Sequence, residues 1–217
     1  MIDNPGADRK LLVIGGGGHG KVVIDAARTR GWNPVGVLDR TGLGDECIGV
    51  PVIGRDDDAL ALFETGLRFA VVAIGQNRVR SEIGERLIAL GFVCPPIVHR
   101  SAVVSPYACV EDGAVVLANA VVNADARIGK FAIVNTGAIV EHDCTIGHGA
   151  HVAPRSVMGG STHIGDRTLF GIGSVARPGT RIDADAVIGA GSVVVAAVTA
   201  GTLVMGAPAR TRGQGRG

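Results

Sequence analysis

Residues 128–152 read IGKFAIVNTGAIVEHDCTIGHGAHV. An aliphatic residue stands at every sixth position of this stretch, and Ala or Cys stands four places after each of them. The frame extends from Val98 to Val194, and all 17 of its positions are apolar. In a chain with 47% apolar residues, chance would give such a run on the order of once in 400,000 trials.

A six-residue period fits neither an α-helix nor a flat sheet and is typical of a parallel β-helix. Three hexads make one triangular coil, so residues 18 positions apart are expected to stack. The aliphatic residue points inward and the small residue fits beside it near the corner. Glycine often follows the aliphatic residue, as at Gly129 and Gly147, and is expected there to ease the turn.

The first 96 residues follow a different rule, in which aliphatic runs alternate with helical spacing. Strands are predicted at 11–14, 34–39 and 69–74, and helices at 19–30, 56–63 and 77–90, with Asp56 as an N-cap. This alternation predicts a small, Rossmann-like parallel α/β sheet. We therefore predict an α/β domain over 1–96, a β-helix over 97–210 and a flexible tail over 211–217.

Composition excludes several classes of protein. The net charge of +1 gives no reason to expect nucleic acid as a partner. No apolar run reaches the length of a membrane span, and the first residues lack the pattern of a signal peptide. The cysteines are scattered and are interpreted as small buried hydrophobes in a reducing compartment, so a cytoplasmic location is expected: Cys47, Cys94, Cys109 and Cys144.

The glycine-rich turn after the first strand matches the dinucleotide fingerprint at Gly15, Gly17 and Gly20, with Asp39 at a suitable distance. A NAD-dependent oxidoreductase is one interpretation, although only about half of a full dinucleotide fold precedes the hexads. Glycines and the first turn of a helix receive the phosphates of any nucleotide. A nucleotide sugar is therefore the preferred ligand.

Three histidines fall close together, and His142 among them is flanked by Glu141 and Asp143. His142 lies two residues after an inward Val140, so it is expected on the outside of the coil, where it suits a general base. Asp143, or alternatively Glu141, would support the imidazole. Zinc is the rival interpretation, but no two histidines are 18 residues apart, so no pair stacks within one prism. Cys144 occupies a small inward position and is expected to be inert.

The hexads and the ending Gly206-Ala207-Pro208-Ala209-Arg210 resemble the left-handed β-helix of the hexapeptide-repeat acyltransferases. A narrower resemblance uses the glycine-rich turn, the segments 36–39 and 73–80, Asn135-Thr136, and residues 141–144. These are similar to the nucleotide-sugar N-acetyltransferases and sialic-acid O-acetyltransferase-like proteins of bacterial glycan pathways such as O-antigen synthesis. The resemblance implies a homotrimer with acetyl-CoA between subunits and no metal.

The resemblance also implies a role for individual residues. Gly17, His19 and Gly20 would lie along the diphosphate and Asp39 toward the base or ribose, with Asn77 and a phosphate-pairing Arg80 nearby. His142 would be the base, supported by Asp143, and His151 would lie near the acyl donor or sugar. The pantetheine would run along Gly160, Ile172 and Ala190 toward Pro208 and Arg210. Arg177 would lie near a CoA phosphate.

The expected function is acetyl-CoA-dependent N-acetylation of a nucleotide-linked 4-amino-4,6-dideoxy sugar by direct attack. GDP-perosamine is the first expected substrate and a UDP-amino sugar the second. Two alternatives stay open: a sugar O-acetyltransferase of the sialic-acid type, and a zinc protein resembling the γ-class carbonic anhydrases.

Overall fold

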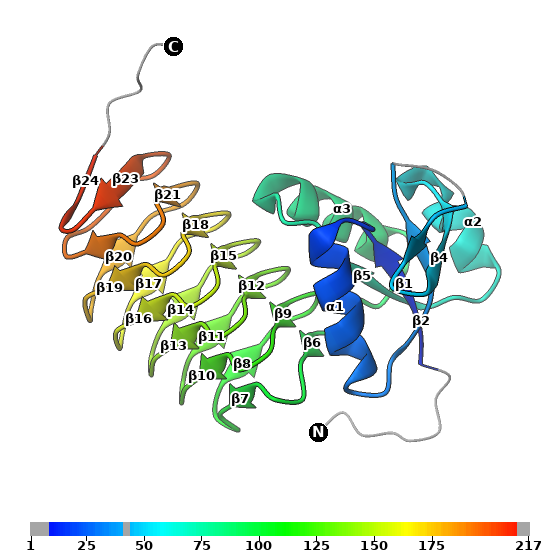
Figure 1. The fold of residues 1–217 in the computed structure, drawn as a ribbon, viewed down its shortest axis with the longest axis horizontal. Helices are drawn as coiled ribbons and strands as arrows, with labels where there is room; N and C mark the ends of the chain where they lie inside the picture. The colour runs from blue at the N-terminus through cyan, green and yellow to red at the C-terminus, as the bar shows by residue number, and fades with distance from the viewer. Residues whose placement is uncertain (1–8, 41–43, 212–217) are drawn as a thin grey trace, which may run out of the picture.

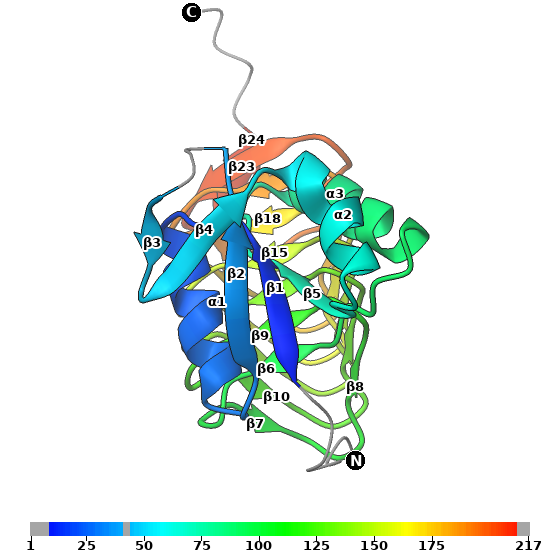
Figure 2. The same cartoon turned by 90° about the vertical axis from the view of Figure 1, so that its right-hand side faces the viewer.

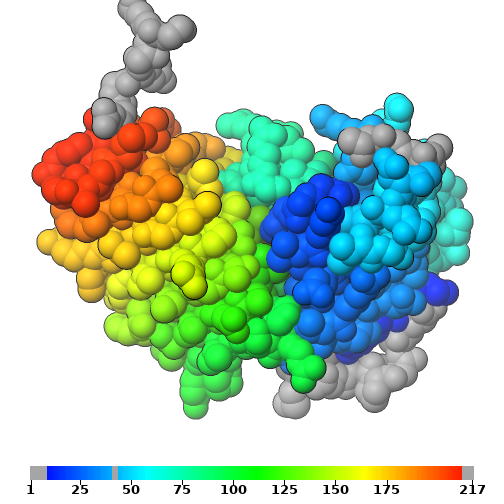
Figure 3. All heavy atoms as spheres, viewed as in Figure 1, coloured from blue at the N-terminus to red at the C-terminus, as the bar shows by residue number. Residues whose placement is uncertain are grey.

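The computed structural model describes residues 9–40 and 44–211. An α/β part lies at one end of a triangular prism, against its first coils, as Figures 1 and 2 show. In the space-filling view of Figure 3 the two parts meet along a continuous boundary. Within the described residues, no helix combines the length and the apolar character that a membrane crossing needs.

The α/β part is built on a five-stranded sheet in the order β3-β4-β2-β1-β5. Four strands run parallel: β1 (Lys10–Ile14), β2 (Asn33–Leu38), β4 (Val50–Gly54) and β5 (Phe69–Val72). The short β3 (Glu46–Cys47) pairs antiparallel with β4. The predicted β1, β2 and β5 are confirmed. The sequence analysis did not predict β3 and β4, whose segment carries turn residues at Gly49, Pro51 and Gly54.

The helices of this part are α1 (Gly18–Arg28), α2 (Ala59–Glu64), preceded by the 3₁₀ turn η1 (Asp56–Asp58), and α3 (Asn77–Ala89). The prediction of Asp56 as an N-cap is wrong. The turn already includes Asp56, and the carboxylate of Asp58 accepts the backbone N–H of Arg55 at 2.8 Å. A 3₁₀ turn at the start of a helix moves the cap by several residues.

The sheet is covered on both faces by apolar packing. Val23, Ile24 and Ala27 of α1 are buried together with residues of the sheet and with Ile97, Val115 and Ile133 of the prism. The helices α2 and α3 pack on the opposite face, where Leu87 is buried with Leu12. Since α1 is held between the sheet and the prism, the glycine-rich turn before it is held there too.

The prism begins at β6 and consists of 17 two-residue strands followed by the pair β23 and β24. Its strands form three faces. The first face holds β6 (Ile97–Val98), β9 (Val115–Val116), β12 (Ile133–Val134), β15 (His151–Val152), β18 (Leu169–Phe170), β21 (Val187–Ile188), β23 (Leu203–Gly206) and β24 (Ala209–Thr211). The second face holds β7 (Val103–Val104), β10 (Val121–Val122), β13 (Ile139–Val140), β16 (Val157–Met158), β19 (Val175–Ala176) and β22 (Val193–Val194). The third face holds β8 (Cys109–Val110), β11 (Arg127–Ile128), β14 (Thr145–Ile146), β17 (His163–Ile164) and β20 (Arg181–Ile182).

The predicted parallel β-helix is confirmed in its register as well as in its class. Val122 pairs with Val140 and then Met158, so stacked residues are 18 positions apart. The inward aliphatic residues form one core with the small residues, which include Ala132, Ala138 and Cys144. The register shortens only in the last coil, where Val187 pairs with Leu203.

The glycine after the inward residue has a different role from the predicted one. The left-handed backbone at the corners falls two positions later, at residues such as Asn119 (φ 57°) and Asp143 (φ 59°). The earlier glycines allow successive coils to approach. A Cβ at Gly129 would lie 2.8 Å from the carbonyl oxygen of Ile146, and one at Gly147 would lie 2.5 Å from the nitrogen of Asp166.

Cys47, Cys94 and Cys144 are buried as predicted, whereas Cys109 is exposed. Cys109 precedes the inward Val110 and therefore points out of its strand. Of the predicted tail, Thr211 ends β24, and residues 212–217 lie outside the described residues.

Candidate active site

The glycine-rich turn joins β1 to α1 at the carboxyl edge of the sheet. The N-cap of α1 is Gly17, and the carboxylate of Asp39, at the end of β2, accepts the backbone N–H of Gly16 at 2.5 Å. A Cβ at Gly20 would overlap the carbonyl oxygen of Gly15, so this position requires glycine. The first N–H groups of a helix have no partner within the helix and form an anion-binding end. The turn is therefore suited to a phosphate group.

A groove of 610 Å³ opens between this turn and the prism. Its walls come from the start of α1, from Gly75, from the first face and from the corner that joins the first and second faces. The lining residues are Gly18, His19, Val22, Gly75, Asn135, His151, Ala153, Pro154, Leu169, Gly171, Ile172, Val187, Ile188, Gly189 and Ala190. Four predicted site residues thus share one groove: His19, His151, Ile172 and Ala190. Gly160, Pro208 and Arg210 are not among its lining residues.

Two histidines lie close together in the lining of the groove, with the ring centroids of His19 and His151 6.4 Å apart. Burial, together with the charge of Arg80, lowers the pKa of His19 to about 4 and that of His151 to about 3. Both imidazoles are therefore neutral at physiological pH. The Nε2 of His19 is buried without a hydrogen-bond partner among the described residues.

Asn135 fixes the tautomer of His151. The side-chain oxygen of Asn135 accepts the backbone N–H of Thr136 at 2.7 Å, so its amide nitrogen is the group 3.0 Å from Nε2 of His151. The amide donates, and Nε2 accepts. The hydrogen of the neutral imidazole is consequently on Nδ1.

His142 lies elsewhere, at the corner between the second and third faces, which is opposite the first face in a triangular prism. Its Nδ1 is 2.8 Å from Oδ2 of Asp143, and the two side chains are 61% and 56% exposed. The hydrogen bond that His142 donates to Asp143 raises the pKa of His142, and the charges of Asp143 and Glu141 add to this. Because a carboxylate only accepts, Nδ1 carries the hydrogen and Nε2 keeps its lone pair.

The neighbours of His142 account for its placement. Its ring lies over Gly160, where a Cβ would come within 2.5 Å of Cε1 and Nε2, so the predicted stacking of these two residues is confirmed. Glu141 turns away and accepts the amide of Asn123 at 2.9 Å, which leaves Asp143 as the hydrogen-bonded carboxylate. Cys144 is buried as predicted, and burial raises the pKa of its thiol.

The structure contradicts the prediction that Arg80 pairs with a phosphate. Its side chain is completely buried, and its guanidinium donates to protein oxygens from Nε, Nη1 and Nη2. Asn77, also predicted to bind substrate, donates to the carbonyl oxygen of Arg167 at 2.8 Å and accepts from Arg80 at 2.9 Å. A ligand would have to break the bonds of Arg80, because all five donors of its guanidinium are used, whereas the amide of Asn77 keeps one N–H.

The N-terminal part, residues 10–87, matches the family described as the PglD N-terminal domain. The whole fold is similar to perosamine N-acetyltransferase from Caulobacter crescentus, at 40% identity and a TM-score of 0.93 over 94% of this chain and 97% of that one. That structure is a variant with one histidine replaced by asparagine, in complex with CoA and GDP-perosamine. The acetyltransferase domain of PglB from Neisseria gonorrhoeae, in complex with acetyl coenzyme A, is 38% identical with a TM-score of 0.88, over 95% and 100% of the two chains.

The chain belongs to the hexapeptide-repeat sugar N-acetyltransferases. Membership in this acetyltransferase family makes the protein an enzyme and its prism a left-handed β-helix. WeeI from Acinetobacter baumannii, at 22% identity and a TM-score of 0.65 over 93% and 99% of the chains, shares the fold.

Zinc was the rival interpretation for the histidine cluster. Across residues 9–40 and 44–211 there is no group of three His, Cys, Asp or Glu side chains that would hold a metal. His151 pairs with Leu169 and His163 with Thr145, as the spacing predicted. The two relatives described above bind CoA and acetyl-CoA, respectively.

Sequence reasoning missed two features of the site. Asn135 belongs to a motif of the family resemblance, but its hydrogen bond to His151 was not predicted. That bond requires residues 16 positions apart to meet at one corner. The burial of Arg80 was missed because its acceptors in the prism are about 50 and 70 residues later in the chain. The helical spacing around Arg80 was compatible with either solvent or ligand.

Proposed function

We propose that this protein transfers the acetyl group of acetyl-CoA to the amine of a nucleotide-linked 4-amino-4,6-dideoxy sugar, with GDP-perosamine as the first candidate. The observation that carries the proposal is the groove that joins the glycine-rich turn to the prism. One end of this groove suits a diphosphate, and the other is lined by Ile172 and Ala190, which the family resemblance assigns to pantetheine. The complex of the Caulobacter relative with both CoA and GDP-perosamine supports the same pair of substrates.

His142 is the proposed general base. The sugar amine attacks the thioester carbonyl carbon, so a nitrogen–carbon bond forms and the carbon–sulfur bond breaks. The amine proton passes to Nε2 of His142, and CoA leaves as the thiolate, which takes up a proton. Asp143 accepts from Nδ1 and so holds the tautomer that leaves Nε2 basic.

A second copy of the chain is needed to complete this site. The groove occupies the first face and one of its corners, whereas His142 lies at the opposite corner of the same prism. The two halves of the chemistry therefore meet only between subunits, and we propose a homotrimer in which each groove receives the His142 corner of a neighbour. Ile172, exposed at 59%, provides apolar surface in the groove for such an approach.

The activity is tested by mixing the protein with acetyl-CoA, a thiol reagent and a panel of acceptors. We expect release of CoA thiol with GDP-perosamine, and an N-acetylated product by mass spectrometry. The already acetylated sugar is the matched control and should release none. A faster reaction at a hydroxyl of a sugar without a nucleotide would support O-acetylation instead and contradict the proposal.

The shared site is tested by mixing two inactive variants. His142→Asn removes the base, and Ile172→Glu blocks the groove with a charge. After joint reassembly, some sites combine an intact corner from one chain with an intact groove from another, so activity should return. If the mixture stays as inactive as its parts, while native mass spectrometry shows mixed trimers, the site lies within one chain.

A further inference from the structure

Arg80 lies on α3 with none of its side chain exposed. On the α/β side its Nη1 donates to the carbonyl oxygens of Ile74 and Gly75, at 2.9 and 3.0 Å. Its Nη2 donates to the side-chain oxygen of Asn77 at 2.9 Å. The guanidinium thus holds the loop that follows β5, and Gly75 of this loop lines the groove.

The remaining N–H groups of Arg80 point into the prism. Nε donates to the carbonyl oxygen of Phe131 at 2.7 Å, and Nη2 donates to that of Gly149 at 2.7 Å. Gly149 lies two residues before His151. All five donors of the guanidinium are used, and they join the edge of the sheet to two successive coils of the prism.

The acceptor corner at Phe131 is held in place by packing. Phe131 is completely buried with a left-handed backbone (φ 56°). A Cβ at Gly84 of α3 or at Gly113 of the preceding coil would overlap its ring. The Phe131 ring thus packs directly against two glycines, and this close packing holds the carbonyl oxygen that Arg80 contacts.

No carboxylate neutralises Arg80 among the ion pairs of the described residues, and neutral oxygens surround its charge. Burial lowers the pKa of Arg80 to about 10, which leaves it charged at neutral pH. A buried charge is costly, and an apolar side chain would fill such a space with less penalty. The planar fork of donors is what arginine adds here.

The two groove histidines lie on the two sides that Arg80 connects. His19 belongs to the glycine-rich turn of the α/β part, and His151 belongs to β15 of the prism. The charged or titratable groups that act on His151 are Arg80 and His19, and the one that acts on His19 is Arg80. The same guanidinium that joins the two parts therefore also sets the field at both imidazoles.

We propose that Arg80 is a positioning residue that locks the glycine-rich edge of the sheet onto the prism, so that His19 and His151 are held next to each other in the lining of one nucleotide-sugar groove. This proposal rests on the proposed function only for the identity of the ligand in the groove. The hydrogen bonds of Arg80 that join the two parts are present without any ligand. Arg80 therefore neither binds a phosphate nor lies in solvent.

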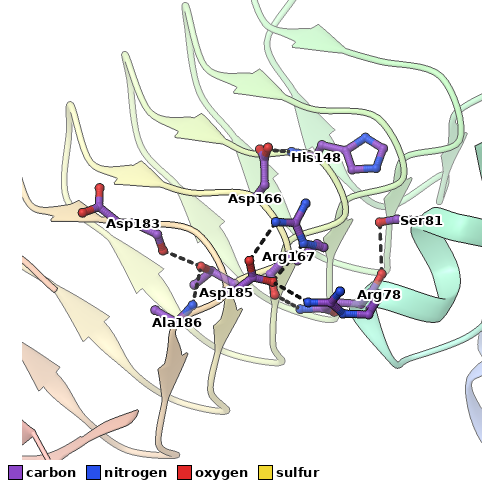
Figure 4. A network of polar contacts seen from close by, with 10 residues as sticks. Arg78, Ser81, His148, Asp166, Arg167, Asp183, Asp185 and Ala186 are labelled. Carbon is purple, nitrogen blue, oxygen red and sulfur yellow. Dashed lines mark hydrogen bonds and ion pairs between the residues drawn. The ribbon is translucent and has the colours of Figure 1, made fainter. Parts of the chain in front are cut away.

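The test compares Arg80→Met and Arg80→Lys with Arg78→Met as the matched control. Arg78 lies on the same helix, is 68% exposed and reaches Asp185 at 3.7 Å, as Figure 4 shows. Two quantities are measured below the unfolding temperature: the affinity for GDP by calorimetry, and the pKa values of His19 and His151 by proton NMR. The NMR signals are assigned with His19→Gln and His151→Asn.

In Arg80→Met we expect both imidazole pKa values to rise, because the positive charge that disfavours their protonation is gone. We expect GDP affinity to fall roughly tenfold or more, since the walls of the groove are no longer held together. Arg80→Lys keeps the charge but offers donors from one nitrogen only, so it should keep the low pKa values and still lose GDP affinity. Arg78→Met should change neither quantity.

Unchanged pKa values of His19 and His151 in Arg80→Met would overturn the proposal. An arginine that supports the fold without positioning these two histidines would give that result. If Arg80→Met does not fold, Arg80→Lys decides: wild-type GDP affinity in that variant would show that the donor fork is not needed. Failure of the proposed function gives a different pattern. The wild-type protein would then bind no nucleotide, while the NMR titrations of the free protein would still report on Arg80.

Discussion

The groove and the outer corner of the prism use the same side chain in opposite ways. His19 and His151 are largely enclosed, and burial lowers their pKa to about 4 and about 3. His142 is exposed beside a carboxylate, and the hydrogen bond that it donates to Asp143 raises its pKa. Desolvation favours the neutral imidazole, and an adjacent anion favours the charged one.

This difference supports the roles that we propose for the three histidines. A base must accept a proton near neutral pH, and His142 is the histidine of the three that is suited to it. His151 is a neutral donor whose hydrogen is fixed on Nδ1 by Asn135. A histidine that stays neutral orients a ligand, whereas one that titrates near neutrality moves a proton.

The largest expected effect is the loss of the base. His142→Asn should lower kcat about 10²- to 10⁴-fold, the usual contribution of a general base, without lowering the melting temperature, because the side chain is exposed. Steady-state kinetics on the purified protein measure this. His163→Asn, on the third face one coil further, is the control and should keep its activity. Equal losses in both variants would show that the comparison between corner and groove is wrong.

The next effect tests whether the position of the His142 ring over Gly160 matters for activity. In Gly160→Ala the new methyl group would lie 2.5 Å from Nε2 of His142, so the ring must move away. Because misplacement by about 1 Å costs on the order of 10²-fold, we expect kcat to fall roughly 10- to 100-fold with the fold intact. Ser161→Ala is the neighbouring control. A crystal structure with the ring unmoved and full activity would contradict this.

Asp143→Asn tests the cause of the raised pKa. The reactive form of His142 is neutral, so kcat/KM should rise with pH until the pKa is passed. Removing the carboxylate lowers that pKa toward its ordinary value of about 6.5, and the acid limb should move to lower pH. The plateau should also fall, by about tenfold, since the tautomer is no longer fixed. An acid limb that stays in place would mean that another group is titrating.

The smallest effect is expected at Glu141. Its carboxylate accepts from Asn123 and acts on His142 only through its charge. Glu141→Gln should shift the acid limb slightly to lower pH and leave the plateau within about twofold. The same pH–rate profile measures it. A plateau loss as large as that of Asp143→Asn would exchange the roles of the two acids.

The prism was predictable from the sequence because each hexad repeats the same local rule. Val134 and Val140 must face inward, and the register follows once every third strand is paired. The α/β part was predicted less completely. Its β3 and β4 are short and pair with each other around Gly49, and their place in the sheet depends on contacts that β2 supplies.

The site was predictable only where a residue acts through its immediate neighbours. His142 and Asp143 are adjacent in the chain, and Gly160 lies one coil away, so these contacts follow from the period. The prediction that Arg80 pairs with a phosphate was wrong because some of its acceptors belong to the other part of the molecule, whereas the substrate-binding role of Asn77 stays a prediction. A charged side chain with no visible partner in the sequence looks like a ligand residue until its long-range acceptors are known.

By itself the sequence determined the coil, its register and the outward direction of His142, because a repeating backbone turns a period into a position. The tertiary structure decided which histidines are neutral, why Arg80 is buried, and that the groove and the base lie on opposite sides of one prism. Those properties depend on which distant segments exclude water and offer oxygens to the same side chain, and no local pattern records that.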